Sequence, residues 1–151
     1  MSMPKAGETA PDFAAPDQHG TTHTLSQYRG RKVALYFYPA DDTPGCTAQA
    51  CNLRDNHERL QTEGYVVIGV SPDGVESHKK FAEKHRLPFT LLADPEKKIL
   101  TAYGAWGEKK LYGKTVTGVK RTTFLIDENG NIERVIASVR TGAHAEQILK
   151  K

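Results

Sequence analysis

The chain has 151 residues, of which 38% are hydrophobic and 26% charged, and its formal net charge is +3. This length fits one domain with a hydrophobic core, and the composition is neither that of a disordered segment nor that of a membrane protein. Lys and Arg are interspersed with Asp and Glu, so we expect no basic surface for nucleic acid.

The start of the chain and its cysteines bear on the compartment. No apolar run follows Lys5, unlike in a secretory signal, and the longest apolar runs, residues 33–38 and 65–70, are too short to cross a bilayer. We therefore expect a cytoplasmic protein without a membrane association, in a compartment that keeps thiols reduced. Only two cysteines are present, five residues apart. Redox chemistry is a better explanation for them than a structural disulfide.

The predicted elements begin with a short, loop-rich N-terminal extension. Pro and Gly residues punctuate residues 1–20, and residues 21–25 suit a short strand before a helical turn at 26–28. The unbroken β-prone run at residues 33–38 is typical of a strand buried on both faces, and Pro39 ends it.

The middle of the chain alternates between helices and strands. After a turn-rich stretch, a helix is predicted over residues 46–63, with Gly64 as its stop. The pattern then predicts a buried strand at residues 65–70, a helix from about 71 to 85, a strand at 89–92 and a helix at 95–103.

The last third of the chain holds a predicted hairpin. Residues 104–118, with several Gly and Lys, show no periodic pattern and are predicted to be irregular. Strands at residues 122–126 and 132–137 are joined by a turn that contains Asn129-Gly130, a strong hairpin signal. A short amphipathic helix is predicted over residues 143–151.

This order of elements predicts an α/β fold. Alternating strands and helices favour a central sheet covered by helices on both faces. No internal repeat, low-complexity tract or linker interrupts the pattern, so we expect a single domain over residues 1–151.

Cys46 is the first candidate for chemistry. In open α/β sheets reactive groups gather at the carboxyl ends of strands, and Cys46 comes seven residues after Pro39, at the predicted start of a helix. Unpaired backbone N–H groups and the helix dipole favour a thiolate there, and Gly45 leaves room for a small substrate. The alternative is that Cys46 is a small buried residue and that Thr43-Pro44 is only a common way to begin a helix.

The spacing between Cys46 and Cys51 restricts how the two can form a disulfide. On a regular helix, residues five apart are separated by about 7.5 Å of rise and roughly 140° of rotation. Their Cα atoms then lie about 9 Å apart, beyond the roughly 7 Å limit for a disulfide. A disulfide with Cys46 therefore requires the first turns to unwind, as suits a bond that forms and is later reduced. A buried helical cysteine is an equally good interpretation of Cys51 alone, and the spacing is not the Cys-x-x-Cys of disulfide-exchange proteins.

The segment around Cys46 is similar to a known family of proteins. Residues 36–47, YFYPADDTPGCT, resemble the active-site signature of the peroxiredoxins, Pro-x-x-x-Thr-x-x-Cys. With a second cysteine five residues on, the segment is similar to the peroxiredoxin Q subgroup, also called bacterioferritin comigratory protein. Further blocks that look like the family lie at residues 10–13, 69–73, 91–94, 112–114 and 118–127.

The resemblance implies a thioredoxin-like fold with a central mixed sheet, and a peroxidase that reduces hydrogen peroxide and organic hydroperoxides without a metal or an organic cofactor. Cys46 would be the peroxidatic cysteine and Cys51 the resolving cysteine, joined in an intramolecular disulfide. The Thr43 hydroxyl would bond the thiolate and the peroxide, Pro39 would shield the pocket from water, and Arg121 would supply a cation.

The resemblance also implies partners. Thioredoxin, or a glutaredoxin-like dithiol protein, would reduce the disulfide, and the subgroup favours a monomer. One position departs from the subgroup: Gln49 stands where a Glu is usual, which leaves the role of a carboxylate there open.

Two other classes of protein compete with this interpretation. One is a metal-binding module, but the histidines have no paired ligand spacing and are expected on the surface. The six are His19, His23, His57, His78, His85 and His144. The other is a binding or chaperone-like protein with inert cysteines. Peroxide-dependent loss of two thiols per chain would separate the enzyme from that class.

Overall fold

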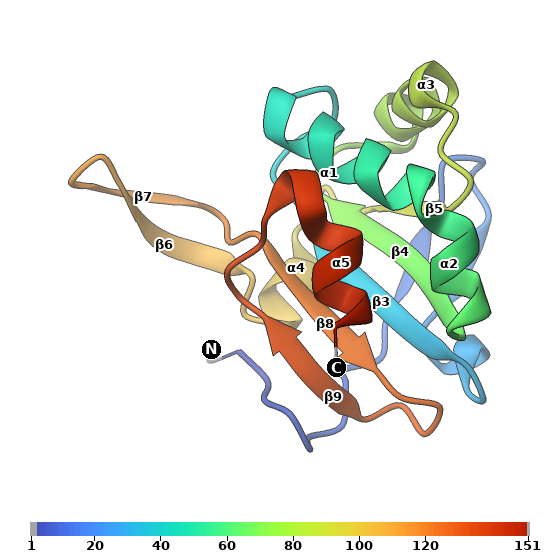
Figure 1. Ribbon diagram of the computed structural model, residues 1–151. Helices are drawn as coiled ribbons and strands as arrows, with labels where there is room; N and C mark the ends of the chain where they lie inside the picture. Colours follow the sequence, from blue (N-terminus) through green and yellow to red (C-terminus); the bar gives the residue numbers. More distant parts are fainter. Residues whose placement is uncertain (1–2, 151) are drawn as a thin grey trace.

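The computed structural model describes residues 3–150, and its centre is a five-stranded sheet (Figure 1). The strand order is β5-β4-β3-β8-β9. The strands are β3 (Lys32–Phe37), β4 (Tyr65–Ser71), β5 (Thr90–Ala93), β8 (Thr122–Ile126) and β9 (Ile132–Ile136). The first three run parallel to one another, whereas β8 and β9 are antiparallel to their neighbours, so the sheet is mixed, as expected.

The central strand β3 is buried on both faces. Alternate side chains enter two separate hydrophobic cores: Val33, Leu35 and Phe37 enter one, and Ala34 and Tyr36 enter the other. This division follows from the two-residue period of a strand. It confirms the interpretation of the unbroken apolar run.

Helices cover both faces of the sheet (Figure 1). The core that contains Tyr36 also receives side chains from α1, α2, α3 and α5, and the core that contains Phe37 receives them from α4 and the N-terminal segment. The remaining bounds are β1 (Ala14–Pro16), β2 (Thr22–Thr24), α1 (Pro44–Asp55), α2 (His57–Thr62), α3 (Val75–His85), α4 (Lys98–Ala102) and α5 (His144–Leu149). Two short 3-10 turns lie at Ser26–Tyr28 and Thr141–Ala143.

The long helix predicted over residues 46–63 is two helices. The break falls at Asn56, whose backbone leaves helical geometry (φ −111°, ψ 13°) and whose side-chain amide donates to the carbonyl of Asn52 at 2.8 Å. Asn competes in this way with helical hydrogen bonding, so a single Asn can end a helix. The predicted stop is confirmed: Gly64 follows α2 with φ 91°.

The prediction that residues 104–118 are irregular is wrong. They contain a hairpin of β6 (Trp106–Leu111) and β7 (Lys114–Val119), which extends away from the main sheet (Figure 1). Tyr112 and Gly113 form its two-residue turn with φ 53° and 79°, the left-handed geometry that tight hairpins require. Most of its described side chains are exposed or half-buried, so the apolar alternation that marks a buried strand is missing.

The predicted hairpin between β8 and β9 is confirmed, with Ile126 opposite Ile132 and Gly130 in the turn at φ 81°.

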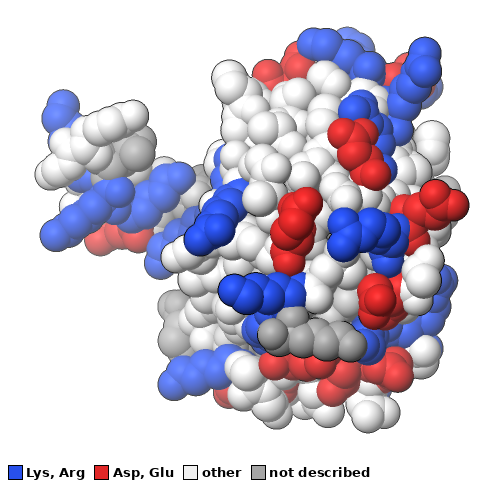
Figure 2. Space-filling view, in the orientation of Figure 1, with Lys and Arg blue, Asp and Glu red and all other residues white. Residues whose placement is uncertain are grey.

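Charges of both signs intermingle on the face of the molecule in Figure 2, while lysines gather on the projecting β6–β7 hairpin. Among the described residues, no helix is both long and apolar enough to cross a membrane.

Candidate active site

The site is built where β3 ends and α1 begins. Thr43 is the N-cap residue of α1, in extended geometry (φ −89°, ψ 154°), and Pro44 opens the helix. Cys46 is therefore the third residue of the helix, and its side chain is almost fully buried at 2% exposure. The backbone N–H groups of this first turn have no partner within a helix, so they are available to an anion. The predicted position of Cys46 at a helix start is confirmed.

Arg121 lies beside the cysteine. It immediately precedes β8, and Thr122 of β8 pairs with Phe37 at the end of β3, so the sheet register brings Arg121 to the start of α1. Its Nη2 donates to the sulfur of Cys46 at 3.3 Å, and its Nη1 donates to Oε1 of Gln49 at 2.5 Å. The bond to Gln49 fixes the orientation of the guanidinium, so that its other N–H group points at the sulfur and can stabilise a thiolate there.

Gly45 has a more specific role than making room for a substrate. A Cβ atom at this position would lie 3.3 Å from Nη2 of Arg121. A side chain there would be in tight contact with Arg121, so the Gly leaves the guanidinium its position against the sulfur.

Gln49 faces the same guanidinium from α1. Its side chain is fully buried, and its Nε2 has no hydrogen-bond partner within the described residues. Because the amide is neutral, it orients Arg121 without cancelling its charge. A carboxylate at this position would be a direct competitor of the Cys46 thiolate for the same cation.

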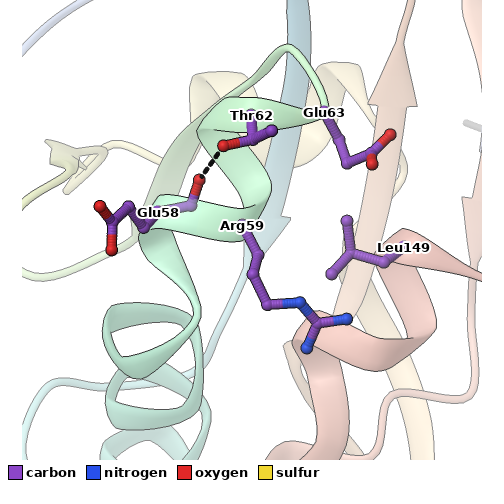
Figure 3. Close-up of a pocket in the computed structure, with 5 residues that line it drawn as sticks. All are labelled: Glu58, Arg59, Thr62, Glu63 and Leu149. Atoms are coloured by element: carbon purple, nitrogen blue, oxygen red, sulfur yellow. Dashed lines mark hydrogen bonds between the residues drawn. The ribbon is translucent and has the colours of Figure 1, made fainter.

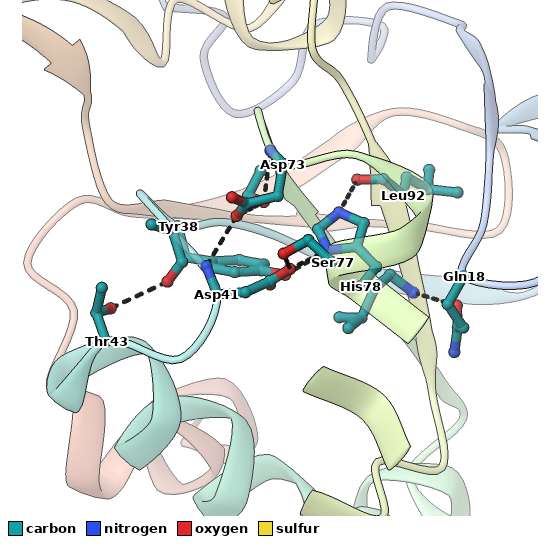
Figure 4. A network of polar contacts seen from close by, with 11 residues as sticks. Gln18, Tyr38, Asp41, Thr43, Asp73, Ser77, His78 and Leu92 are labelled. Atoms are coloured by element: carbon teal, nitrogen blue, oxygen red, sulfur yellow. Dashed lines mark hydrogen bonds and ion pairs between the residues drawn. The ribbon is translucent and has the colours of Figure 1, made fainter. Parts of the chain in front are cut away.

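Thr43 and Pro39 belong to the loop between strand and helix. The Thr43 hydroxyl donates to the carbonyl of Ala40 at 3.0 Å, as Figure 4 shows, and the Thr43 carbonyl accepts from the backbone N–H of Thr47 at 2.8 Å. The bond from this hydroxyl to the Cys46 thiolate that the resemblance implies is not among those found in residues 3–150. Pro39 is half-buried just after β3.

Cys51 lies on the same unbroken helix as Cys46, and both thiols are free. The separation expected on a regular helix therefore applies, and a disulfide requires the start of α1 to unwind. The half-buried Cys51 sulfur lies 3.9 Å from Nδ1 of His85 at the end of α3. Sequence reasoning missed this neighbour because it lies 34 residues away on another helix.

Comparison with known proteins identifies the family of the chain. The model of the AhpC/TSA family matches residues 6–135. The chain belongs to this family. Peroxiredoxin Bcp of Escherichia coli (strain K12) is 46% identical over 149 residues, which are 99% of this chain and 96% of the relative. Peroxiredoxin Bcp of Bacillus subtilis (strain 168) is 46% identical over 144 residues, 95% of this chain and 92% of the relative.

Solved structures agree with this assignment. Peroxidoxin BcpB of Mycobacterium tuberculosis superposes with a TM-score of 0.84 at 38% identity, over 97% of this chain and 94% of the other. Bacterioferritin comigratory protein of Xanthomonas campestris superposes with a TM-score of 0.88 at 32% identity, over 95% and 94%. The chain is thus a thiol-dependent peroxidase of the Bcp/peroxiredoxin Q type with a thioredoxin-like fold.

A buried polar network anchors the active-site loop of this peroxiredoxin to the sheet and α3 (Figure 4). The Tyr38 hydroxyl donates to Oδ1 of Asp41 at 2.6 Å, and the Asp41 backbone N–H donates to Oδ2 of Asp73 at 2.8 Å. Oδ2 of Asp41 lies 2.7 Å from Nδ1 of His78, whose Nε2 lies 2.9 Å from the Leu92 carbonyl. Because that carbonyl only accepts, Nε2 is the donor in this contact.

The ligand atoms of Asp41, Asp73 and His78 lie within 4.8 Å of one another, as in a metal site. Here the hydrogen bonds of the network already engage these atoms. The network therefore positions the loop without requiring an ion.

The expectation that the histidines lie on the surface is wrong for two of them. His78 and His144 are both fully buried. His144 has Thr123 at 2.7 Å from Nε2 and Gln147 at 2.9 Å from Nδ1, so both of its ring nitrogens are satisfied, as are those of His78. Burial lowers the pKa of His144, which favours the neutral ring.

Two tyrosines of the core complete the surroundings of the site. Burial raises the pKa of both Tyr36 and Tyr38 well above 10, and the Asp41 carboxylate adds to the effect in each. They stay neutral phenols at physiological pH and add no charge to compete with the thiolate.

A surface hollow between α2 and α5 is unrelated to this chemistry. Figure 3 shows its lining, which consists of Glu58, Arg59, Thr62, Glu63 and Leu149. None of these side chains is buried, and no cysteine lines it. The candidate reactive site is instead the buried thiol of Cys46 at the start of α1.

Proposed function

We propose that this peroxiredoxin reduces hydroperoxides with Cys46 as the attacking group, and the contact between Arg121 and the Cys46 sulfur carries the proposal. The thiolate attacks the terminal peroxide oxygen in line with the O–O bond. The O–O bond breaks, the sulfur becomes a sulfenic acid, and the remaining oxygen leaves as water or an alcohol. The Xanthomonas campestris neighbour has alkyl peroxide reduction activity, which supports organic hydroperoxides as substrates beside hydrogen peroxide.

The surroundings of Cys46 lower the barrier of this step. Negative charge moves from the sulfur to the departing oxygen, and the Arg121 guanidinium and the first-turn N–H groups of α1 can donate to both. We assign Thr43 a change of partner: its hydroxyl leaves the Ala40 carbonyl and bonds the thiolate or the peroxide. Pro39, half-buried beside the loop, excludes bulk water from the pocket.

The second half of the cycle uses Cys51. The start of α1 unwinds, the Cys51 thiol condenses with the sulfenic acid, and water leaves as the disulfide forms. A dithiol protein then restores both thiols by exchange through a mixed disulfide. We propose thioredoxin or a glutaredoxin-like protein in this role. We further propose that the enzyme acts as a monomer of one domain, residues 1–151, in the cytoplasm, where such reductants keep thiols reduced.

Two substitutions test the assignment of the cysteines. Cys46→Ser should abolish peroxide turnover, and retained turnover would overturn the attacking role of Cys46. Cys51→Ser should leave the first oxidation of Cys46 unchanged but stop recycling by a dithiol protein. Normal dithiol-linked turnover in that variant would refute the resolving role.

A further inference from the structure

A histidine faces the second cysteine rather than the first. His85 is the last residue of α3, its side chain is 18% exposed, and its Nδ1 lies 3.9 Å from the Cys51 sulfur. We propose that His85 is the base that takes the proton from the Cys51 thiol during resolution. This inference rests on the resolving role proposed for Cys51.

The other ring nitrogen of His85 faces a carboxylate. Nε2 lies 3.5 Å from Oδ1 of Asp42, and within the described residues it has no hydrogen-bond partner. With the proton of a neutral ring on Nε2, directed at Asp42, Nδ1 is left as the acceptor for the thiol. Nucleophile, base and orienting carboxylate therefore stand in the order that activates a weak nucleophile.

Asp42 is held in its carboxylate form and in place. Nζ of Lys84 lies 2.9 Å from each of its oxygens. This hydrogen bond is the main cause of the lowered pKa of Asp42, and His85 adds to it. The backbone of Asp42 has φ 61°, in the left-handed region that few residues other than Gly adopt. The surrounding loop therefore fixes the backbone conformation that carries this carboxylate.

His85 can stay beside Cys51 while Cys46 moves. Nη1 of Arg54, which is near Cys51 on α1, donates to the His85 backbone carbonyl at 2.8 Å. This bond ties the second half of α1 to the end of α3. Only the first turns of α1 must unwind to bring Cys46 to Cys51, so the base and its thiol remain together.

The proposed step balances in atoms and charge. His85 takes the proton from the Cys51 thiol, and the thiolate attacks the sulfur of the Cys46 sulfenic acid. The S–S bond forms as the S–O bond breaks, and the departing hydroxide takes the proton from the imidazolium and leaves as water. Cys51 is oxidised, the Cys46 sulfur is reduced from sulfenic acid to disulfide, and His85 returns to its neutral form.

Other charges around the pair affect its pH response. Asp42 in the loop faces the imidazole and is itself paired with Lys84 of α3, while Arg54 and Asp55 lie on α1. The pKa of Arg54 is raised, chiefly by its hydrogen bond to Asp55 and in part by Cys51. Arg54 is therefore a fixed cation that favours the thiolate once the proton has left.

The test separates the two chemical steps. Reduced protein is mixed with one equivalent of hydrogen peroxide, quenched at set times, and analysed by intact mass for sulfenic acid, trapped with dimedone, and for disulfide. In His85→Gln we expect sulfenic acid to form at the wild-type rate and disulfide to form at least about tenfold more slowly at pH 7. Glu83→Gln, exposed on the same helix, is the matched control and should resolve like wild type.

Two further readouts identify a base rather than a structural role. Added imidazole should restore much of the disulfide rate in His85→Gln. The defect should also shrink as the pH rises past about 8.5, where thiols ionise without help. A wild-type rate in His85→Gln would overturn the inference, and so would a defect that neither imidazole nor pH changes. If wild type itself accumulates sulfenic acid without a Cys46–Cys51 disulfide, the proposed resolving function fails, and the inference fails with it.

Discussion

The Nη2 atom of Arg121 lies 3.3 Å from the Cys46 sulfur although 75 residues separate the two in the chain. The antiparallel pairing of β3 and β8 produces this contact, because Phe37 at the end of β3 is opposite Thr122 at the start of β8. The loop after β3 and the residue before β8 therefore share one end of the sheet. The stabilisation of the departing oxygen that we propose for Arg121 depends on this register.

Removing the guanidinium should slow the first chemical step. We expect Arg121→Gln to reduce the rate of Cys46 oxidation by about a hundredfold or more, because a charged donor aimed at the reacting sulfur is lost. Arg121→Lys should also be slow, since an ammonium cannot bond Cys46 and Gln49 in the same planar geometry. Stopped-flow measurement of the reaction with hydrogen peroxide tests both variants. Lys120→Gln, an exposed neighbour, is the control; equal rates in all four proteins would exclude a role for Arg121.

Gly45→Ala should separate activity from stability. The new Cβ would lie 3.3 Å from Nη2 of Arg121 and push the guanidinium away from the sulfur, so we expect slower oxidation of Cys46. The free energy of unfolding should change by no more than about 1 kcal/mol, because the helix propensity that Ala adds is offset by the tight contact with Arg121. Gly74→Ala is the control, since a Cβ there meets no atom within 4 Å. An unchanged peroxide rate in Gly45→Ala would show that the added Cβ does not displace Arg121 from the Cys46 sulfur.

Gln49→Glu should weaken the interaction of Arg121 with the Cys46 sulfur. A carboxylate in bonding distance of Arg121 would neutralise the charge that now serves Cys46. We expect slower peroxide reduction, measured by stopped flow with hydrogen peroxide. Gln49→Met, neutral and of similar size, distinguishes the added charge from the lost amide. If Gln49→Glu reacts as fast as wild type while keeping its fold, the neutrality of this position has no catalytic value.

Acid should destabilise the protein in part through His144. Burial lowers its pKa below the usual 6.5, so below that pH the unfolded chain binds more protons than the folded one. The free energy of unfolding should then fall as the pH drops below about 6.5, by up to about 1.4 kcal/mol per pH unit for one such group.

Denaturant unfolding at pH 7 and pH 5 tests this expectation. His144→Gln should be less stable at both values, because it loses buried hydrogen bonds, but its stability should change less between them. Burial also lowers the pKa of His57, so His57→Gln should flatten the profile as well. A wild-type stability that is the same at pH 7 and pH 5 would contradict this account.

Features that are local in the sequence could be predicted. The apolar run of β3 showed burial on both faces, and Thr43-Pro44 after a buried strand correctly placed Cys46 at a helix start. The break at Asn56 was missed because a single side-chain hydrogen bond ends the helix within a continuous helical pattern. The hairpin at Tyr112-Gly113 was missed because its exposed strands lack apolar alternation and its turn pair is less typical.

Features that depend on tertiary packing could not be predicted from local patterns. The position of Arg121 came from a family resemblance, since only the pairing of β3 with β8 brings it to the thiol. Nothing in the sequence around His85 indicates Cys51, because their contact depends on how α1 packs beside α3. His78 and His144 are buried by partners from other elements, which composition alone does not reveal.

One measurement tests the central claim most directly. Fully reduced protein is treated with one equivalent of hydrogen peroxide, and free thiols and intact mass are followed, then followed again after a dithiol reductant such as thioredoxin is added. We predict loss of both thiols, a mass lower by two hydrogens, a disulfide between Cys46 and Cys51, and full recovery with the reductant. Thiols that react no faster than free cysteine would contradict the account, because the contact between Arg121 and Cys46 would then confer no reactivity.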